Sequence, residues 1–271
     1  MKILYCTNAD IESSVALNLL LPTLARHDVC VAISPRIGSA SGSGDEPAPR
    51  RELRTAEQTL AIELLFPLIE KAGLPDDGKR FLTFGELERH RGIRVASLPN
   101  ANSEEGLGFV RDVAPDLILS VRYGSIFRAE CIAIPALGVL NLHAGLLPTY
   151  RGVIAAFRAL MNGDDEIGCT LHYITDGSID TGPILGTSRI PVDPARSLLW
   201  HLLQLYPGAA SMIADALDRL GHGEVRTGTL QLGGTYYSYP TESEWQDFGR
   251  RGWRIADASD LAATWRRYIP A

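Results

Sequence analysis

Two polar residues, Asn141 and His143, end an otherwise apolar run that begins at Gly138. The run has the length and composition of a buried β-strand, in which side chains two positions apart project from the same face. Both groups carry N–H donors that can stabilise negative charge on an oxygen atom. A core Asn and His bonded to the backbone is the alternative, and for this pair alone neither interpretation is favoured.

A second polar segment, residues 176–182, reads Asp-Gly-Ser-Ile-Asp-Thr-Gly. Recurring Asp and Gly are typical of a tight turn, so Asp180 taken alone is interpreted as a turn residue, as is Asp176. A carboxylate beside an imidazole can also hold that ring in a defined protonation state and pass a proton. Asp180 therefore becomes a catalytic candidate through its combination with Asn141 and His143.

Together with the segment between them, these motifs resemble the folate-dependent formyltransferase family. Residues 144–152 read Ala-Gly-Leu-Leu-Pro-Thr-Tyr-Arg-Gly, and the resemblance extends from about Asp116 to Val192 with the order and spacing of the motifs kept. The family includes methionyl-tRNA, glycinamide ribonucleotide and nucleotide-sugar formyltransferases. The resemblance implies N10-formyltetrahydrofolate as formyl donor, no metal, and a catalytic triad of Asn141, His143 and Asp180.

The resemblance also implies which residues line the two substrate sites. Residues 121–127 match the family segment beside the pterin ring of the donor, and residues 150–152 match a loop that wraps the site. For Arg151, a solvated surface position is as well supported as a ligand contact. The residues implied for the donor site are Arg122, Tyr123, Gly124, Ile126, Leu140, Asp176, Gly177 and Ile179, and those implied for the acceptor site are Tyr150, Arg151 and Gly152.

Formyl transfer needs side chains of these types. An amine attacks the formyl carbon, and negative charge develops on the formyl oxygen, where Asn141 and His143 can donate hydrogen bonds. The amine must lose a proton, and N10 of the folate must gain one. By the resemblance, Asp180 holds His143 in the useful protonation state and helps to relay that proton.

The chain around these motifs has the pattern of an α/β protein with a Rossmann-like, mainly parallel sheet, because β-branched runs alternate with longer helical patterns. Ligands of such sheets bind beyond the carboxyl ends of the strands. Asp10 or Ser13 can cap the first helix, and Ser103 can cap another. Strands are expected at 2–6, 28–34, 81–84, 94–98, 116–121, 138–143, 168–174 and 183–191, and further helices at 52–71, 154–161 and 194–220.

The expected domains are a catalytic domain over residues 1–222 and a small C-terminal subdomain over 223–271. Residues 225–239 predict a hairpin or extended arm, and Thr241 begins a capping box. The stretch from Gly38 to Gly44 predicts a mobile surface loop. The C-terminal aromatic residues build a small core, or alternatively stack an acceptor ring or form a homodimer surface; they are Tyr236, Tyr237, Tyr239, Trp245, Trp253 and Trp265.

Composition restricts the class of protein. Hydrophobic residues make up 45% and charged residues 21%, as in soluble globular proteins. The net charge of -6 argues against a nucleic-acid partner.

The apolar run at the N-terminus is too short for a signal peptide or a membrane span, so a cytoplasmic protein is expected. Four cysteines lack metal-binding spacing and are interpreted as buried thiols: Cys6, Cys30, Cys131 and Cys169.

The turn at residues 7–14 contains Asp10 and Glu12 but no glycine. Glycinamide ribonucleotide formyltransferases carry a Gly-rich phosphate loop there, and the two acids would repel a phosphate. The same lack of glycine excludes a nicotinamide-dependent dehydrogenase.

The short C-terminal arm resembles that of nucleotide-linked amino-sugar N-formyltransferases, so a sugar amine is the expected acceptor. Methionyl-tRNA and a hydroxyornithine-type amine stay open as acceptors, and binding or hydrolysis of formyltetrahydrofolate is the alternative to transfer.

Overall fold

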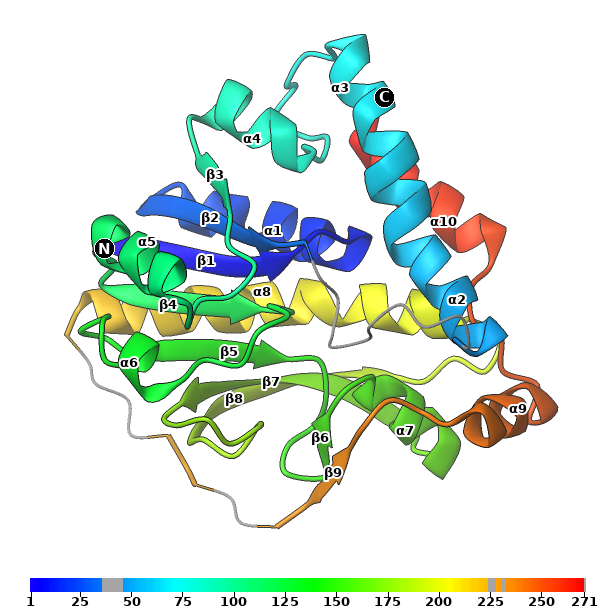
Figure 1. Ribbon diagram of the computed structural model, residues 1–271. Coiled ribbons are helices and arrows are strands. Elements are labelled where there is room, and N and C mark those ends of the chain that lie inside the picture. Colours follow the sequence, from blue (N-terminus) through cyan, green and yellow to red (C-terminus); the bar gives the residue numbers. More distant parts are fainter. Residues whose placement is uncertain (36–45, 224–227, 231–232, 271) are drawn as a thin grey trace.

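The computed structural model describes residues 1–35, 46–223, 228–230 and 233–270, and a seven-stranded sheet forms its centre (Figure 1). The strands are β1 (Lys2–Asn8), β2 (Asp28–Ser34), β3 (Arg94–Ser97), β4 (Leu117–Val121), β5 (Val139–His143), β7 (Glu166–Ile174) and β8 (Ile184–Pro191). Their order is β3-β2-β1-β4-β5-β7-β8. The strands from β3 to β5 in this order are parallel, whereas β7 and β8 pair antiparallel. The expected Rossmann-like, mainly parallel α/β fold is confirmed.

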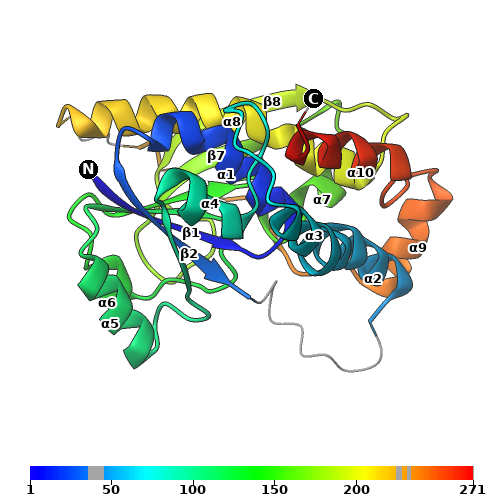
Figure 2. The same ribbon diagram turned by 90° about the horizontal axis from the view of Figure 1, so that it is seen from above.

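Helices cover both faces of the sheet (Figure 2). Helices α1 (Ile11–Leu24) and α8 (Leu198–Gly221) lie on one face, and α5 (Glu104–Val113) and α6 (Ala129–Ile132) lie on the other. Each face has its own hydrophobic cluster. The side chains of β1 alternate between the two clusters, because period two sends Tyr5 to the α1 face and Cys6 to the α5 face.

The remaining helices surround this core. A continuous helical segment comprises α2 (Ala48–Arg54), a π-helix η1 (Thr55–Leu65) and α3 (Phe66–Ala72). The others are α4 (Phe84–Arg91), α7 (Ala155–Asn162), α9 (Glu242–Arg250), α10 (Ala258–Trp265) and the short 3-10 helix η2 (Arg266–Tyr268). No described helix is both long and apolar enough to cross a membrane.

Side-chain caps begin the helices where the sequence predicts them. The Asp10 carboxylate accepts a hydrogen bond from the Ser13 N–H at 2.7 Å, and the Ser103 hydroxyl accepts one from the Gly106 N–H at 3.0 Å. Thr241 and Glu244 form the expected capping box at the start of α9. Local sequence therefore fixes the starts of α1, α5 and α9.

One predicted strand and one predicted helix start are wrong. Residues 81–84 are not a strand, because Thr83 and Glu86 form a capping box that begins α4. The buried Glu86 carboxylate also binds the Arg80 guanidinium at 2.7 Å, so this segment is held by side chains. The long helix α8 begins at Leu198 and not at 194, because Ser197 caps it.

A two-stranded parallel sheet ties the loop after β5 to the C-terminal arm (Figure 1). It consists of β6 (Tyr150–Gly152) and β9 (Thr235–Tyr237). Gly152 has a φ of 97°, and a Cβ atom there would lie 2.1 Å from the Tyr237 carbonyl oxygen, so only glycine fits. The described part of the arm is thus extended and pairs with a segment far away in the chain.

Aromatic side chains of the C-terminal part pack into the main core. The Trp245 ring lies 4.5 Å from that of Phe157, and the Tyr268 ring lies 5.1 Å from that of Phe66. The division of the chain at residue 223 stays a prediction. The predicted mobile loop from Gly38 to Gly44 lies outside the described residues.

Candidate active site

Asn141 and His143 lie at the carboxyl end of β5, where the sheet changes from parallel to antiparallel pairing. Asn141 is directly opposite His172 of β7. The Asn141 amide nitrogen lies 3.1 Å from Nε2 of His172, and no other described residue bonds the amide. Since Nδ1 of His172 lies 2.9 Å from the Tyr173 carbonyl oxygen, which can only accept, we assign the hydrogen to Nδ1, and Nε2 then accepts from the Asn141 amide. One N–H of Asn141 is therefore fixed by His172, and the second stays available to a substrate.

Sequence reasoning missed His172. Its side chain is buried, although it stands in the otherwise apolar strand that the sequence predicted from 168 to 174. That isolated imidazole was the available signal. Its significance depends on pairing with Asn141, which only the register of two strands reveals.

The Asp180 carboxylate lies between the two imidazole rings. Its Oδ2 atom lies 3.4 Å from Nδ1 of His143, and its Oδ1 atom lies 3.5 Å from Nε2 of His172. The backbone N–H of Gly152 donates to Oδ2 at 2.8 Å. Asp180 has a φ of 55°, in the left-handed region that Asp and Asn tolerate better than other non-glycine residues. The turn thus holds the carboxylate in a defined position between two rings.

Asp180 stays ionised in this position. Burial alone would raise the pKa of Asp180, but attraction to His143, the contact with His172 and the hydrogen bond from the Gly152 N–H lower it to about 2. The carboxylate is therefore a fixed negative charge with little exposure to solvent. Such a group can orient an imidazole and stabilise its protonated form.

His143 is held at both ring nitrogens. Nε2 lies 2.7 Å from the Tyr150 carbonyl oxygen and donates to it, while Nδ1 faces Asp180. The Tyr150 hydroxyl donates to Asp164 at 2.6 Å, so Tyr150 serves the site through its backbone. The loop that follows β5 therefore positions both His143 and Asp180.

Close packing under His143 requires glycine at position 145. The Thr170 hydroxyl donates to the Gly145 carbonyl at 2.7 Å and accepts from the Leu147 N–H at 3.0 Å, which fixes this part of the loop. A Cβ atom on Gly145 would lie 2.4 Å from Cβ of Ala155 and 2.5 Å from Nε2 of His143.

Gly145→Ala is therefore expected to lower the free energy of unfolding by about 1–3 kcal/mol, because the added methyl group must displace the helix or the imidazole. Urea denaturation measures this change. Gly108→Ala is the matched control, because a Cβ atom there meets nothing within 4 Å. The same stability for both variants would contradict the packing described here.

The residues implied for the donor site form two exposed turns and one core position. Arg122 directs its guanidinium at Glu12 and Asp10, and the Tyr123 hydroxyl donates to the Leu98 carbonyl at 2.6 Å. Gly124 and Ile126 are exposed beyond β4, whereas Leu140 is fully buried in β5. Asp176, Gly177 and Ile179 lie in the turn before Asp180.

Arg151 connects that turn to the loop after β5. Its Nε donates to the Ile179 carbonyl at 3.1 Å. Asp176 accepts from the Ser178 N–H at 2.7 Å, as expected of a turn-forming residue, and this bond lowers the pKa of Asp176. Asn141, His143, Asp180 and the loop 150–152 are thus brought together.

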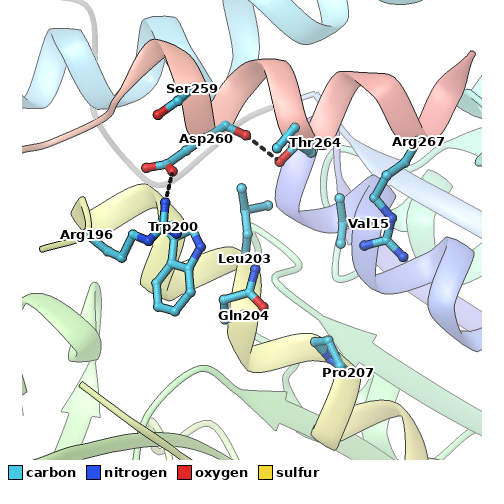
Figure 3. A pocket seen from close by; sticks show the side chains of 11 residues that line it. Val15, Arg196, Trp200, Leu203, Gln204, Pro207, Ser259, Asp260, Thr264 and Arg267 are labelled. Atoms are coloured by element: carbon cyan, nitrogen blue, oxygen red, sulfur yellow. Dashed lines mark hydrogen bonds and ion pairs between the residues drawn. The ribbon is translucent and has the colours of Figure 1, made fainter. Parts of the chain in front are cut away.

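A separate cleft of about 260 Å³ lies between α1, α8 and α10 (Figure 3). None of the candidate catalytic or substrate-binding residues named above lines this cleft. Arg196 and Trp200 stand on one side of it and Arg267 on the other. Among the described residues, no three His, Cys, Asp or Glu side chains form a metal site in this cleft or elsewhere.

Comparisons with known proteins identify relatives of this chain. Residues 88–199 match the family model described as formyl transferase. Over 190 residues the chain is 33% identical to the methionyl-tRNA formyltransferase of Aromatoleum aromaticum, covering 68% of this chain and 57% of that protein. The chain spans about half the length of the curated relatives that it matches.

Solved structures share the fold. A sugar N-formyltransferase from Shewanella superposes with a TM-score of 0.56 at 17% identity, covering 99% of this chain and 88% of that one. A phosphoribosylglycinamide formyltransferase from Anaplasma phagocytophilum gives a TM-score of 0.55 at 17% identity, covering 86% and 93%. The matched family model, the sequence relatives and the shared fold agree, and the chain belongs to the folate-dependent formyltransferase family.

Proposed function

We propose that this protein transfers a formyl group from N10-formyltetrahydrofolate to a primary amine. The observation that carries the proposal is the Asp180 carboxylate held between His143 and His172 beside the Asn141 amide. This group lies at the carboxyl end of β5, where ligands of such sheets bind. The folate would supply the formyl carbon that the amine attacks.

Asn141 is the donor to the developing oxyanion. One of its N–H groups is held by His172, which fixes the amide and leaves the second N–H for the substrate. A donor fixed before the reaction stabilises the transition state without reorganisation. His143 can add a second hydrogen bond once Nε2 leaves the Tyr150 carbonyl.

Asp180 and the two histidines provide the path for protons. The attacking amine must lose one proton, and the leaving N10 must gain one. An imidazole next to an ionised carboxylate can accept the first and deliver the second, and Asp180 contacts two such rings. The low pKa of Asp180, about 2, keeps the carboxylate charged while the rings exchange protons.

The turn after β4 suits the flat ring system of the donor. Ile126 exposes 53% of its surface although it is a large apolar residue, and Gly124 beside it leaves the backbone open. An exposed apolar side chain in a turn with an exposed glycine matches a flat heterocycle. We assign Tyr123, Gly124 and Ile126 to the donor site on this basis, together with the turn 176–179.

For the acceptor we propose the amine of a nucleotide-linked sugar. Arg151 pairs with Tyr236 in the register of β6 and β9, next to the candidate catalytic residues, and the Tyr236 side chain is 49% exposed. Such a pair suits the phosphates and base of a nucleotide. The Shewanella sugar N-formyltransferase, which covers 99% of this chain in superposition, supports this choice.

Methionyl-tRNA is the second candidate acceptor. The curated sequence relatives favour it, because the protein of Aromatoleum aromaticum is a methionyl-tRNA formyltransferase. The net charge of -6 weighs against it.

A panel of amines tests the proposal. The protein is incubated with N10-formyltetrahydrofolate and either nucleotide-linked amino sugars, charged initiator tRNA or hydroxyornithine-type amines, and products are identified by a mass gain of one CO group. We expect the highest kcat/KM with an amino sugar, and Asp180→Asn controls for uncatalysed formylation. Product with tRNA alone would overturn the acceptor, and release of formate without any formylated amine would overturn transfer itself.

A further inference from the structure

Arg122 lies beside the catalytic residues, but its side chain turns away into a group of acids. Arg122 directly follows β4, whose last residue, Val121, pairs with Leu142, the residue before His143. The Arg122 guanidinium contacts Asp10 at 3.2 Å, Glu12 at 2.8 Å and Glu57 at 3.7 Å. We call Asp10, Glu12, Glu57 and Arg122 the Arg122 cluster.

Backbone strain accompanies this contact. Arg122 has a φ of 61°, which is unfavourable for a residue with a long side chain. The contacts with three carboxyl groups stabilise that conformation. They therefore fix the first residue of the turn 122–127, which carries the proposed donor site.

The cluster has more negative than positive groups and almost no solvent. The side chains of Asp10 and Glu12 are completely buried, and Glu57 is 7% exposed. Oε2 of Glu12 accepts from Arg122 and from the Tyr206 hydroxyl at 2.8 Å. Oε1 of Glu12 is buried and has no hydrogen-bond donor. A buried carboxylate oxygen without a donor is costly, so the cluster needs one more hydrogen-bond donor that reaches Oε1 of Glu12.

Glu57 can supply that hydrogen. Its carboxyl group and that of Glu12 both contact the Arg122 guanidinium, at 3.7 Å and 2.8 Å, so the two acids lie close together. The π-helix η1 brings Glu57 to this position, and the next residue, Gln58, donates to the Ala9 carbonyl at 3.3 Å. π-Helices are rare and often occur at functional sites.

We propose that the Arg122 cluster positions the formyl-donor site, an inference that rests on the proposed function. One proton, which Glu57 shares with Glu12, holds the cluster together. Arg122 acts through the turn 122–127 and not by contact with the reacting atoms. The proton reduces the repulsion between the carboxyl groups, so the guanidinium keeps its partners.

The surroundings of Glu57 favour its protonated form. Burial and the charge of Glu12 raise the pKa of Glu57 well above its ordinary value of 4.5, against the lowering effect of Arg122. The surrounding hydroxyl and thiol groups come from five other segments, and burial raises the pKa of each, so they stay neutral: Tyr5, Cys169, Tyr206, Tyr239 and Tyr268. Arg50 stacks on Tyr239 at 4.0 Å and is a further cation near the cluster.

A proton held only in the folded state makes stability depend on pH. Because the pKa of Glu57 is raised on folding, its contribution is complete below the ordinary value and is lost as pH rises towards the raised one. The amide of the Glu57→Gln variant would carry the hydrogen permanently. The thermal midpoint of Glu57→Gln relative to wild type should therefore rise steadily between about pH 5 and about pH 8.

The paired variants Glu57→Gln and Glu12→Gln test the positioning role. We expect Glu57→Gln to keep the KM for N10-formyltetrahydrofolate within about threefold of wild type, because an amide N–H replaces the shared hydrogen. Glu12→Gln removes the carboxylate that binds Arg122, and the donor KM should rise by about tenfold or more, with the acceptor KM unchanged. Glu63→Gln, an exposed position on the same π-helix, is the control.

The two readouts separate this proposal from the proposed function. The pH dependence of the thermal midpoint needs no turnover, and binding of tetrahydrofolate by calorimetry replaces the donor KM if no amine is formylated. A difference in midpoint that is flat with pH would overturn the shared proton. A donor KM raised as much by Glu57→Gln as by Glu12→Gln would overturn the positioning role.

Discussion

Asp180→Asn is expected to lower kcat for formyl transfer by about 100- to 10,000-fold, the usual contribution of a positioned acid or base. Asparagine keeps the size of the side chain, tolerates the left-handed backbone and can still accept from the Gly152 N–H. It removes the charge between His143 and His172. Steady-state kinetics with the preferred amine measures the loss.

Asp218→Asn is the matched control, since Asp218 is half exposed in α8 and pairs with the surface residue Arg26. Its kcat should equal that of wild type.

Because the pKa of Asp180 falls from 3.8 to about 2 on folding, ionised Asp180 contributes about 2 kcal/mol to stability near neutral pH, which is lost as pH falls through about 2. The thermal midpoint of Asp180→Asn should therefore fall by only a few degrees at neutral pH. Near-normal turnover in a folded Asp180→Asn protein would contradict the proposed mechanism.

Asn141→Ala is expected to lower kcat by about 100- to 1,000-fold, the effect of losing one oxyanion donor. The KM for the folate should change little, because the amide N–H acts on charge that develops only during the reaction. The thermal midpoint should stay within a few degrees of wild type, since Asn141 makes one side-chain hydrogen bond within the described part of the chain.

Asn141→Asp separates the hydrogen-bond donor from the volume of the side chain. The carboxylate has nearly the same shape but no N–H, so its kcat should be as low as that of the alanine variant. A kcat close to wild type for Asn141→Asp, or a change confined to KM, would show that Asn141 only shapes the site.

The sequence could predict what local patterns determine. Period two in a buried strand places Asn141 and His143 on one face, and capping residues such as Asp10 and Ser103 mark where helices begin. Strands β1, β2, β4 and β5 follow from their apolar runs. These features depend on residues that are neighbours in the chain.

The remaining features depend on contacts between distant segments. His172 became recognisable as a site residue only once the register of β5 and β7 placed it opposite Asn141. The orientation of Arg122 likewise depends on acids more than a hundred positions earlier and on a π-helix. Tyr150 shows a third limit, because its role at the site is carried by a carbonyl group that every residue type has.

The pairing of β6 with β9 makes the C-terminal arm a structural member of the catalytic centre. The carbonyl of Tyr150 and the N–H of Gly152 hold His143 and Asp180, and the strand that contains them is aligned by residues 235–237. Exchanging the segment after residue 223 with that of a relative, to change the acceptor, would therefore also replace a support of the chemistry. A productive chimaera must therefore keep the hydrogen bonds between the loop around Gly152 and the arm, from Val153 to Tyr237 and from Thr235 to Thr149.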